Sequence, residues 1–238
     1  MNAAADGQIG LAVIVGAHGG IGAALLSALG TSPWQDQFSA VIGLGRRTTP
    51  ALDLLDEASI MACAAHVAGL GRLGLLIDAT GLLHDAQVQP EKSLRQIDPQ
   101  SMARSFAINA IGPALLMKHF LPLLPRTGRP VFASLSAKVG SIGDNRLGGW
   151  YSYRASKAAL NQLVHTAAIE LQRRAPQAIC VALHPGTVDT RLSTPFARTG
   201  LQVQSPAQAA DALLRVIAGL TPADTGGFFS YQGEALPW

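Results

Sequence analysis

A chain of 238 residues, of which 48% are hydrophobic and 14% charged, is long enough to bury a large core and too apolar for a disordered protein. Its net charge of +3 is spread along the sequence, which excludes the clustered basic face of a nucleic-acid-binding protein. The N-terminal residues have neither a basic segment nor a long apolar core, and no stretch has 18 apolar residues in a row, so we expect a cytoplasmic protein that does not bind membranes.

Short apolar runs rich in β-forming residues alternate with longer amphipathic stretches. The predicted strands are 11–15, 40–44, 73–79, 130–135, 178–183 and 228–231, and a short third strand is expected near Asp53. The predicted helices are 21–29, 58–67, 100–124, 151–174 and 207–219. Apolar strands separated by helices indicate an α/β fold, with a mostly parallel, doubly wound sheet of about seven strands and helices on both faces. No linker or repeat divides the chain, so residues 1–238 are predicted to form a single domain.

A glycine-rich turn follows the first predicted strand, with glycines at positions 16, 19, 20 and 22. Residues without a Cβ permit a tight turn and a close approach of the backbone to a ligand. A helix that starts near Gly20 would point its free N–H groups and its positive dipole end at a pyrophosphate. The turn therefore predicts a Rossmann-type dinucleotide site, in which Ile21 also lies and in which the imidazole of His18 either touches a phosphate or faces solvent.

Two arginines, Arg46 and Arg47, follow the second predicted strand. An acidic residue at this place would bind the ribose 2′-hydroxyl of NAD, whereas an arginine pairs with the 2′-phosphate of NADP. Because the segment contains two arginines and no acid, the sequence favours NADP(H) over NAD(H).

Tyr153 and Lys157 are four residues apart in a predicted helix, which places their side chains on one helix face. A free phenol has a pKa of about 10, and a nearby positive charge lowers it. A tyrosine with a lowered pKa can give a proton to a carbonyl oxygen near neutral pH. The spacing alone also occurs by chance, so the other motifs must show whether Tyr153 and Lys157 form a catalytic pair.

These features together resemble the short-chain dehydrogenase/reductase family over nearly the full chain. Gly16, Gly20 and Gly22 are similar to its cofactor-loop motif, and the Tyr153 and Lys157 pair is similar to its catalytic motif. The resemblance implies that Asn109 holds the active-site lysine through a water molecule. The segments 140–157 and 227–238 resemble the C-factor and sniffer-like carbonyl reductases within this family.

The resemblance also assigns the turn after the fifth long strand to the nicotinamide end of the cofactor. The residues of this turn are Pro185, Gly186, Thr187, Val188 and Thr190. The irregular stretch 184–200, which contains this turn, follows a strand end, where ligands bind in open α/β sheets, and we expect a lid there.

The chain departs from the family pattern in two places. The usual Asn-Asn-Ala-Gly segment is Asp-Ala-Thr-Gly at 78–81, so that only Gly81 carries over. The catalytic serine is assigned to Ser136 from its strand position, with Ser134 and Ser141 as alternatives.

The implied reaction is hydride transfer between NADPH and a small carbonyl or alcohol substrate, with Tyr153 as general acid. Lys157 would lower the pKa of Tyr153 and hold the nicotinamide ribose, so that both residues also belong to the cofactor site. Ser136 would donate a hydrogen bond to the carbonyl oxygen, and Asn109 would fix Lys157 and a proton route.

Several further residues have two interpretations. Asp53 resembles the family residue that meets the adenine, and it is equally suited to capping the next helix. Trp150 and Tyr151, with Leu192 and Phe196, either line an apolar substrate pocket or pack their own loops. Three other side chains are interpreted as packing residues, namely His184, Cys63 and Cys180, and no disulfide or metal site is predicted.

Two other functions are alternatives to the reductase. The first is a C-factor-like signalling protein whose turnover is incidental, and the second is a nucleotide-sugar epimerase or dehydratase, which would need an additional substrate domain. The family commonly forms dimers or tetramers through the helices that carry Asn109 and Tyr153. The small-residue face formed by Ala155, Ala158, Ala159 and Leu163 fits either such pairing or burial against the sheet.

Overall fold

The computed structural model describes residues 10–31, 33–192 and 203–238. A parallel six-stranded sheet forms its centre, in the order β2-β1-β3-β4-β5-β8. Its strands are β1 (Leu11–Val15), β2 (Val41–Leu44), β3 (Leu73–Asp78), β4 (Val131–Leu135), β5 (Ile179–His184) and β8 (Phe228–Ser230). A separate parallel pair joins β6 (Thr187–Val188) to β7 (Val203–Gln204).

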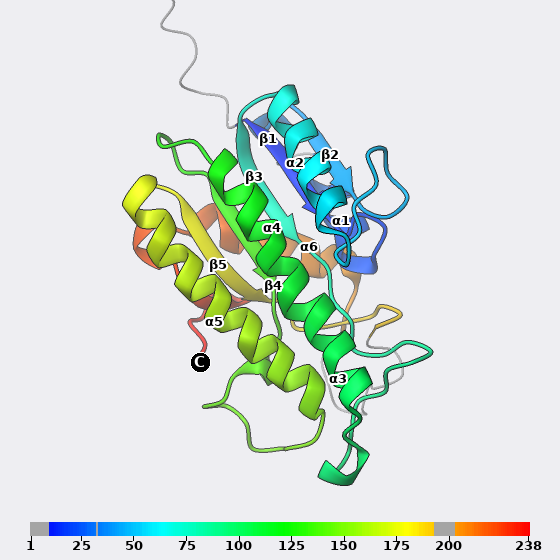
Figure 1. Cartoon of the computed structure of the whole chain (residues 1–238). Coiled ribbons are helices and arrows are strands. Elements are labelled where there is room, and N and C mark those ends of the chain that lie inside the picture. The colour runs from blue at the N-terminus through cyan, green and yellow to red at the C-terminus, as the bar shows by residue number, and fades with distance from the viewer. Residues whose placement is uncertain (1–9, 32, 193–202) are drawn as a thin grey trace, which may run out of the picture.

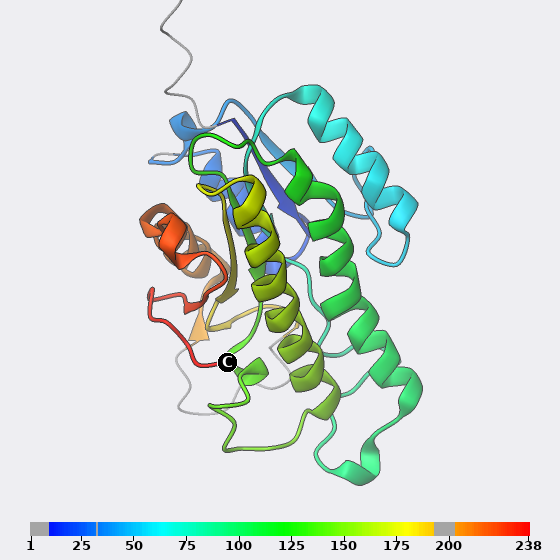
Figure 2. The same ribbon diagram turned by 60° about the vertical axis from the view of Figure 1, so that its left-hand side comes forward.

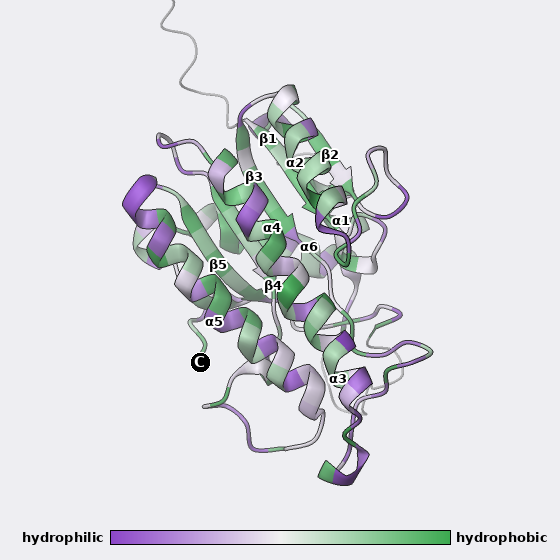
Figure 3. Ribbon diagram, in the orientation of Figure 1, coloured by the Kyte–Doolittle hydropathy of each residue, from purple (hydrophilic) through white to green (hydrophobic). Residues whose placement is uncertain are grey.

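Helices cover both faces of the sheet (Figures 1 and 2). The longer helices are α1 (Gly20–Leu29), α2 (Glu57–Leu70), α3 (Pro99–Phe106), α4 (Gly112–Phe120), α5 (Tyr151–Arg174) and α6 (Pro206–Gly219). Helices α2, α4 and α5 pack on one face around Phe120 and Phe132, and α1 and α6 pack on the other around Ile14 and Leu213. The apolar strands lie at the centre of the molecule, between these two layers (Figure 3). The predicted doubly wound α/β fold is confirmed.

The predicted helix 100–124 is a continuous helical segment that includes an irregular turn. A π-helical stretch, η3 (Ala107–Ile111), joins α3 to α4, and a short 3₁₀ helix, η4 (Leu121–Leu123), ends the segment. The segment is apolar and long enough to cross a membrane, and its Leu116 and Phe120 are completely buried in the protein core. Inserted π turns often occur at functional sites, and this one contains Asn109.

The predicted third strand near Asp53 is absent, which leaves six strands in the main sheet instead of about seven. The chain after β2 folds back instead, since the Leu52 N–H donates to the Gly45 carbonyl at 3.0 Å. The Thr48 hydroxyl donates to the Pro50 carbonyl at 2.7 Å, and Pro50 has no N–H for a sheet ladder. These bonds form a compact turn that does not extend the sheet.

The opposite edge of the sheet, β8, is covered by the residues that follow it. The Ser230 N–H donates to the Glu234 carbonyl, and the Leu236 N–H donates to the Phe228 carbonyl, each at 2.8 Å. The Trp238 ring stacks on Phe228 with 5.7 Å between the centroids. A covered edge does not offer its backbone groups to another chain.

Candidate active site

The glycine turn lies between β1 and α1, as predicted. Gly16 has a φ of +82°, which favours glycine, and a Cβ on Gly22 would lie 2.2 Å from the Gly16 carbonyl oxygen. Gly19 precedes α1 as its N-cap, and α1 begins at Gly20. The first N–H groups of a helix have no partner within the helix, so this turn is suited to an anionic group.

Two other predicted cofactor segments meet the glycine turn. A Cβ on Gly20 would lie 2.6 Å from Cγ2 of Thr190, so the turn after β5 reaches the start of α1. On the other side, His18 is exposed and its Nδ1 lies 3.2 Å from the Cβ position of Gly45, which directly precedes the two arginines. Arg46 and Arg47 are both exposed. The structure therefore brings together segments that are far apart in the sequence.

Helix α5 starts at Tyr151 because the chain before it is fixed by Glu91. This carboxylate is buried and accepts hydrogen bonds from the Ser152 N–H, at 3.2 Å, and from the Ser152 hydroxyl. The Trp150 N–H donates to the Glu91 carbonyl at 2.5 Å, and Trp150 has a left-handed backbone with a φ of 54°. A carboxylate at a helix N-terminus satisfies free N–H groups and interacts favourably with the helix dipole. Glu91 was not among the predicted residues, because nothing in its local sequence links it to a helix 60 residues later.

Lys157 is buried under the ends of β3 and β4. Its Nζ donates to the Leu135 carbonyl at 2.7 Å. A Cβ on Gly81 would lie 3.7 Å from both Lys157 Nζ and Asn109 Oδ1, so these three predicted residues are neighbours. Asn109 is buried as well, and its amide accepts from the Leu82 N–H and donates to the Leu82 carbonyl, each at 2.7 Å. Asn109 thus fixes the loop after β3 beside Lys157.

The ionisation of Tyr153 and Lys157 differs from the expectation. Burial raises the pKa of Tyr153 above its usual value, although a lowering by Lys157 was predicted. The physical reason is that the Lys157 ammonium is directed at the Leu135 carbonyl, which leaves desolvation as the dominant effect on the phenol. Burial also lowers the pKa of Lys157 to about 8, and the charge of Asp78 acts in the opposite direction.

The three candidate serines have different partners. The Ser134 hydroxyl donates to Asp78 Oδ2 at 2.7 Å, and the Ser136 hydroxyl donates to Asn161 Oδ1 at 2.6 Å. Asn161 lies eight residues after Tyr153 on α5, which is about 12 Å along a helix axis. The Ser141 oxygen accepts from the Asp144 N–H at 3.0 Å. All three serines are buried.

The turn after β5 is fixed by the β6–β7 pair. Gly186 has a φ of +78°, and the Gln204 side chain donates to the Pro185 carbonyl at 3.2 Å. Thr187 pairs with Val203 and Val188 with Gln204. Of the lid expected at 184–200, residues 193–200 lie outside the described residues.

The residues with two interpretations are placed as follows. Asp53 accepts the Leu55 N–H at 3.0 Å and so stabilises its own turn, while Asp56 caps α2. The rings of Trp150 and Tyr153 are 6.2 Å apart in an edge-to-face arrangement. Leu192 lies 4.0 Å from the Cβ position of Gly81, and Tyr151 is half-buried. Phe196 lies outside the described residues.

The remaining packing predictions concern His184 and the cysteines. His184 is at the end of β5, and burial lowers its pKa to about 4. Its Nδ1 and the Asn161 Nδ2 are buried and have no hydrogen-bond partner within the described ranges. Cys63 and Cys180 are buried, as predicted, and both are free thiols. The described residues contain no group of three or more metal-ligating side chains.

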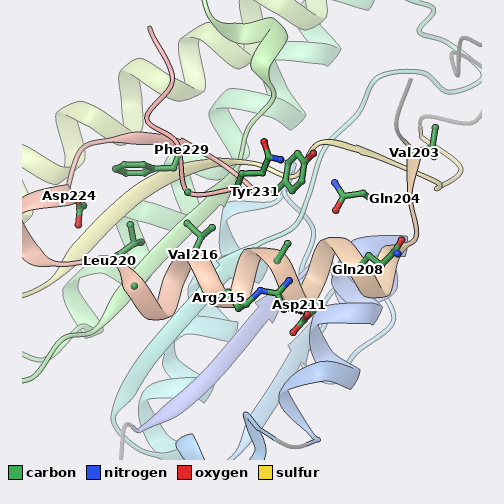
Figure 4. A pocket seen from close by; sticks show the side chains of 14 residues that line it. Val203, Gln204, Gln208, Asp211, Arg215, Val216, Leu220, Asp224, Phe229 and Tyr231 are labelled. Carbon is green, nitrogen blue, oxygen red and sulfur yellow. Dashed lines mark hydrogen bonds and ion pairs between the residues drawn. The ribbon is translucent and has the colours of Figure 1, made fainter. Parts of the chain in front are cut away.

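A hollow of about 1040 Å³ lies between α6 and the turn after β8 (Figure 4). Gln204 and Tyr231 are at the end of this hollow that adjoins Gly186, because both side chains lie within 2.9 Å of the Cβ position of that glycine. Its lining contains neither Tyr153 nor Lys157. The hollow is therefore separate from the residues around Tyr153 and Lys157.

Comparison with known proteins agrees with this geometry. The family model described as short chain dehydrogenase matches residues 10–199. The C-signal protein of Myxococcus xanthus is 39% identical over 146 residues, covering 61% of this chain and 84% of that protein. The 1-hydroxy-2-glutathionyl-2-methyl-3-butene dehydrogenase of Rhodococcus sp. (strain AD45) is 32% identical over 194 residues, covering 82% and 81% of the two chains.

Solved structures show the same architecture. An NADPH-bound carbonyl reductase from chicken fatty liver superimposes with a TM-score of 0.83 at 25% identity, covering 97% of this chain and 95% of that one. The carbonyl reductase Sniffer of D. melanogaster has a TM-score of 0.82 at 22% identity, covering 97% and 100%.

Proposed function

Because the chain belongs to the short-chain dehydrogenase/reductase family, we propose that it is an NADP(H)-dependent oxidoreductase acting on a small carbonyl or alcohol. The observation that carries the proposal is the meeting of four segments at the carboxyl edge of the sheet. These are the glycine turn, the loop fixed by Asn109, the start of α5 with Tyr153 and Lys157, and the turn after β5. This edge is where ligands bind in open α/β sheets.

The cofactor would be held by backbone and side-chain groups along this edge. The start of α1 would face the pyrophosphate, and Arg46 and Arg47 would face the 2′-phosphate, with His18 beside them. The turn from Pro185 to Thr190 would contact the nicotinamide end. The chicken carbonyl reductase that shares this fold was solved with NADPH bound, which supports the choice of NADP(H).

When bound, the nicotinamide supplies the hydride. Tyr153 would then donate its proton to the oxygen of the carbonyl substrate, and the positive charge of Lys157 would favour the phenolate that remains. A serine hydroxyl would stabilise charge on that oxygen. Strand position favours Ser136, but its proton is donated to Asn161, so we propose Ser141, whose oxygen accepts from the Asp144 N–H, with Ser136 and Ser134 as the alternatives. Asn109 would keep Lys157 and the loop at Gly81 in place.

A carbonyl screen tests the proposal. Purified protein is mixed with NADPH and a panel of aldehydes and ketones, and both NADPH consumption and alcohol formation are measured. We expect equal amounts of NADPH consumed and alcohol formed with at least one carbonyl, and a loss of about 100-fold or more in Tyr153→Phe. Consumption of NADPH that is equally fast in Tyr153→Phe would contradict the assignment.

The alternative is a signalling protein that binds the cofactor with incidental turnover, and it is supported by the 39% identity to the C-signal protein. It predicts that Tyr153→Phe binds NADPH normally and keeps the cellular activity. The reductase proposal predicts that the cellular activity is lost together with turnover.

For its setting and assembly, we propose a cytoplasmic protein that forms homodimers or homotetramers. Ala155 on α5 is exposed, and Ala158, Ala159 and Leu163 are half-buried, so a part of this small-residue face is accessible. Sedimentation of the wild type beside Ala155→Arg would test the pairing, because a charged side chain on a paired face is expected to give monomers.

A further inference from the structure

Asp78 is a buried carboxylate for which the proposed reaction has no role. It is the last residue of β3, is 1% exposed and is paired in register with Ser134 of β4. Its Oδ2 accepts from the Ser134 hydroxyl at 2.7 Å, and its Oδ1 accepts from the N–H and the hydroxyl of Thr80 at 3.0 and 2.5 Å. All three donors are neutral. They solvate the carboxylate, which has no direct ionic partner among the described residues.

Lys157 lies at the same end of the sheet, on helix α5, and strand alternation directs Asp78 and Ser134 to the face that α5 covers, as it does Leu76 and Phe132. Its Nζ donates to the carbonyl of Leu135, and Leu135 directly follows the serine that binds Asp78. The ammonium is as deeply buried as the carboxylate, at 2% exposure. Opposite charges that are both removed from water interact more strongly than they would at the surface.

We propose that Asp78 is a positioning residue that acts through Lys157: its negative charge keeps the lysine protonated in the neutral range and so preserves the reductase activity at slightly alkaline pH. The inference rests on the proposed function for its catalytic consequence. The charge coupling itself does not depend on that function. Asp78 replaces the first Asn of the family's usual Asn-Asn-Ala-Gly, which would carry no charge.

The sign of the effect follows from burial. Burial removes water from the ammonium and lowers the pKa of Lys157 to about 8, while Asp78 acts to raise it. Lys157 is therefore charged below about pH 8 and neutral above it. Without the charge of Asp78, burial acts unopposed and the lysine loses its proton at a lower pH. Tyr153 then lacks a positive neighbour, and the rate of reduction falls at a lower pH.

Other titratable groups on the surrounding elements do not replace this charge. Arg104 on α3 pairs with Asp85 at 2.9 Å, and Lys138, in the short 3₁₀ helix η5 (Lys138–Gly140), pairs with Asp144 at 3.4 Å. The remaining groups of these elements are His184 on β5, Lys118 and His119 on α4, which are paired with Glu57, and several side chains on α5. Those on α5 are Tyr151, Tyr153 and Arg154 in its first turns and His165, Glu170, Arg173 and Arg174 farther along the helix. Among the described residues, Asp78 is the charge that acts on the pKa of Lys157.

The coupling is measured directly in the ligand-free full-length chain. The sequence contains four lysines, so the side-chain carbon signals of ¹³C-lysine-labelled protein are few, and the signal that Lys157→Met removes belongs to Lys157. The signal is followed against pH in wild type, Asp78→Asn and two controls. Ser134→Ala removes one hydrogen bond from the carboxylate and keeps its charge, and Asp211→Asn removes a surface charge on α6.

We expect a midpoint near pH 8 in the wild type and a fall of about one pH unit in Asp78→Asn. Ser134→Ala and Asp211→Asn are expected to stay near the wild-type midpoint. An unchanged midpoint in Asp78→Asn, or an equal fall in Ser134→Ala, would overturn the proposal. If Asp78→Asn does not fold, Asp78→Ser is measured in its place, with the same expected fall.

The catalytic consequence is tested by the pH profile of kcat/KM for 4-nitrobenzaldehyde at saturating NADPH. The alkaline limb is expected to move to lower pH in Asp78→Asn, and Asp78→Glu, which restores the charge, should move it back. A shifted lysine signal in a protein that reduces no carbonyl would refute the proposed function and leave the coupling intact. If Asp78→Asn is active and neither the midpoint of its Lys157 signal nor the alkaline limb of its kcat/KM profile differs from the wild type, the role of Asp78 is refuted.

Discussion

Arg46 and Arg47 are the residues on which the choice between the two cofactors depends. Both are exposed, and neither forms an ion pair with another described residue. They follow β2 next to Gly45, whose backbone lies against His18 of the glycine turn. Charged side chains without an acidic partner are available for a phosphate.

The double variant Arg46→Ser/Arg47→Ser is expected to weaken NADPH binding by about 10- to 100-fold, because hydrogen bonds to charged groups contribute roughly 1.5–3 kcal/mol. NADH lacks the 2′-phosphate, so its Kd should change less than about twofold. Nicotinamide fluorescence titrations at fixed salt measure both constants, with the exposed Arg126→Ser as the matched control. Equal weakening of both cofactors would contradict the assignment.

The serine proposed to polarise the carbonyl is the candidate site residue that the sequence predicts least well. Strand position favours Ser136, but its proton is donated to Asn161, far along α5 from Tyr153. Ser141 follows Gly140, whose Cβ position is 2.8 Å from Lys157 Cβ, and its oxygen accepts a hydrogen bond from Asp144. The side-chain partners of a strand-end serine depend on tertiary packing, which a linear pattern does not contain.

Alanine variants separate these serines. The Ser136 hydroxyl donates its hydrogen bond to Asn161. We therefore expect Ser136→Ala to lower the free energy of unfolding by about 1 kcal/mol and to lower kcat by less than about tenfold. Ser141→Ala should lower kcat by about 100-fold with little change in NADPH affinity. Urea denaturation and steady-state kinetics of the same preparations measure both effects. If Ser136→Ala instead loses about 100-fold in kcat and Ser141→Ala less than about tenfold, the hydrogen bond to the carbonyl oxygen comes from Ser136.

At the scale of the elements, α5 was the most predictable, and its start depends on a distant residue. Its observed bounds, Tyr151–Arg174, agree with the prediction because the long amphipathic pattern is local. The cap at its start is not local, since Glu91 comes from the loop after β3. Two other features were also not predictable, namely the missing third strand and the π turn at Asn109, because both depend on hydrogen bonds between distant backbone groups.

Glu91→Ala is expected to lower the free energy of unfolding by about 1–2 kcal/mol, because it leaves the Ser152 N–H at the start of the helix without its acceptor. It should also lower kcat, since Tyr153 lies in this first turn. Glu170→Ala, at an exposed position on the same helix, is the control and should change stability by less than about 0.5 kcal/mol. If both variants lose the same stability, Glu91 does not cap the helix.

For the whole molecule, the alternation of apolar strands with helices was sufficient to predict the doubly wound fold and the edge at which the site lies. The pattern did not predict the hollow beside α6 (Figure 4) or the covered edge of β8. Both depend on how the last residues of the chain return over the sheet. The substrate is equally beyond the sequence, because the loops around Tyr153 and Leu192 shape the space in which it would bind.

The measurement that tests the central claim most directly is a single turnover with NADPH dideuterated at C4 of the nicotinamide. The protein is mixed with a carbonyl that the screen has identified, and the alcohol is analysed by mass spectrometry over time. We predict one deuterium on the carbinol carbon and a rate about 100-fold or more lower in Tyr153→Phe with NADPH still bound. An alcohol without deuterium, or an equal rate in Tyr153→Phe, would contradict hydride transfer with Tyr153 as the acid.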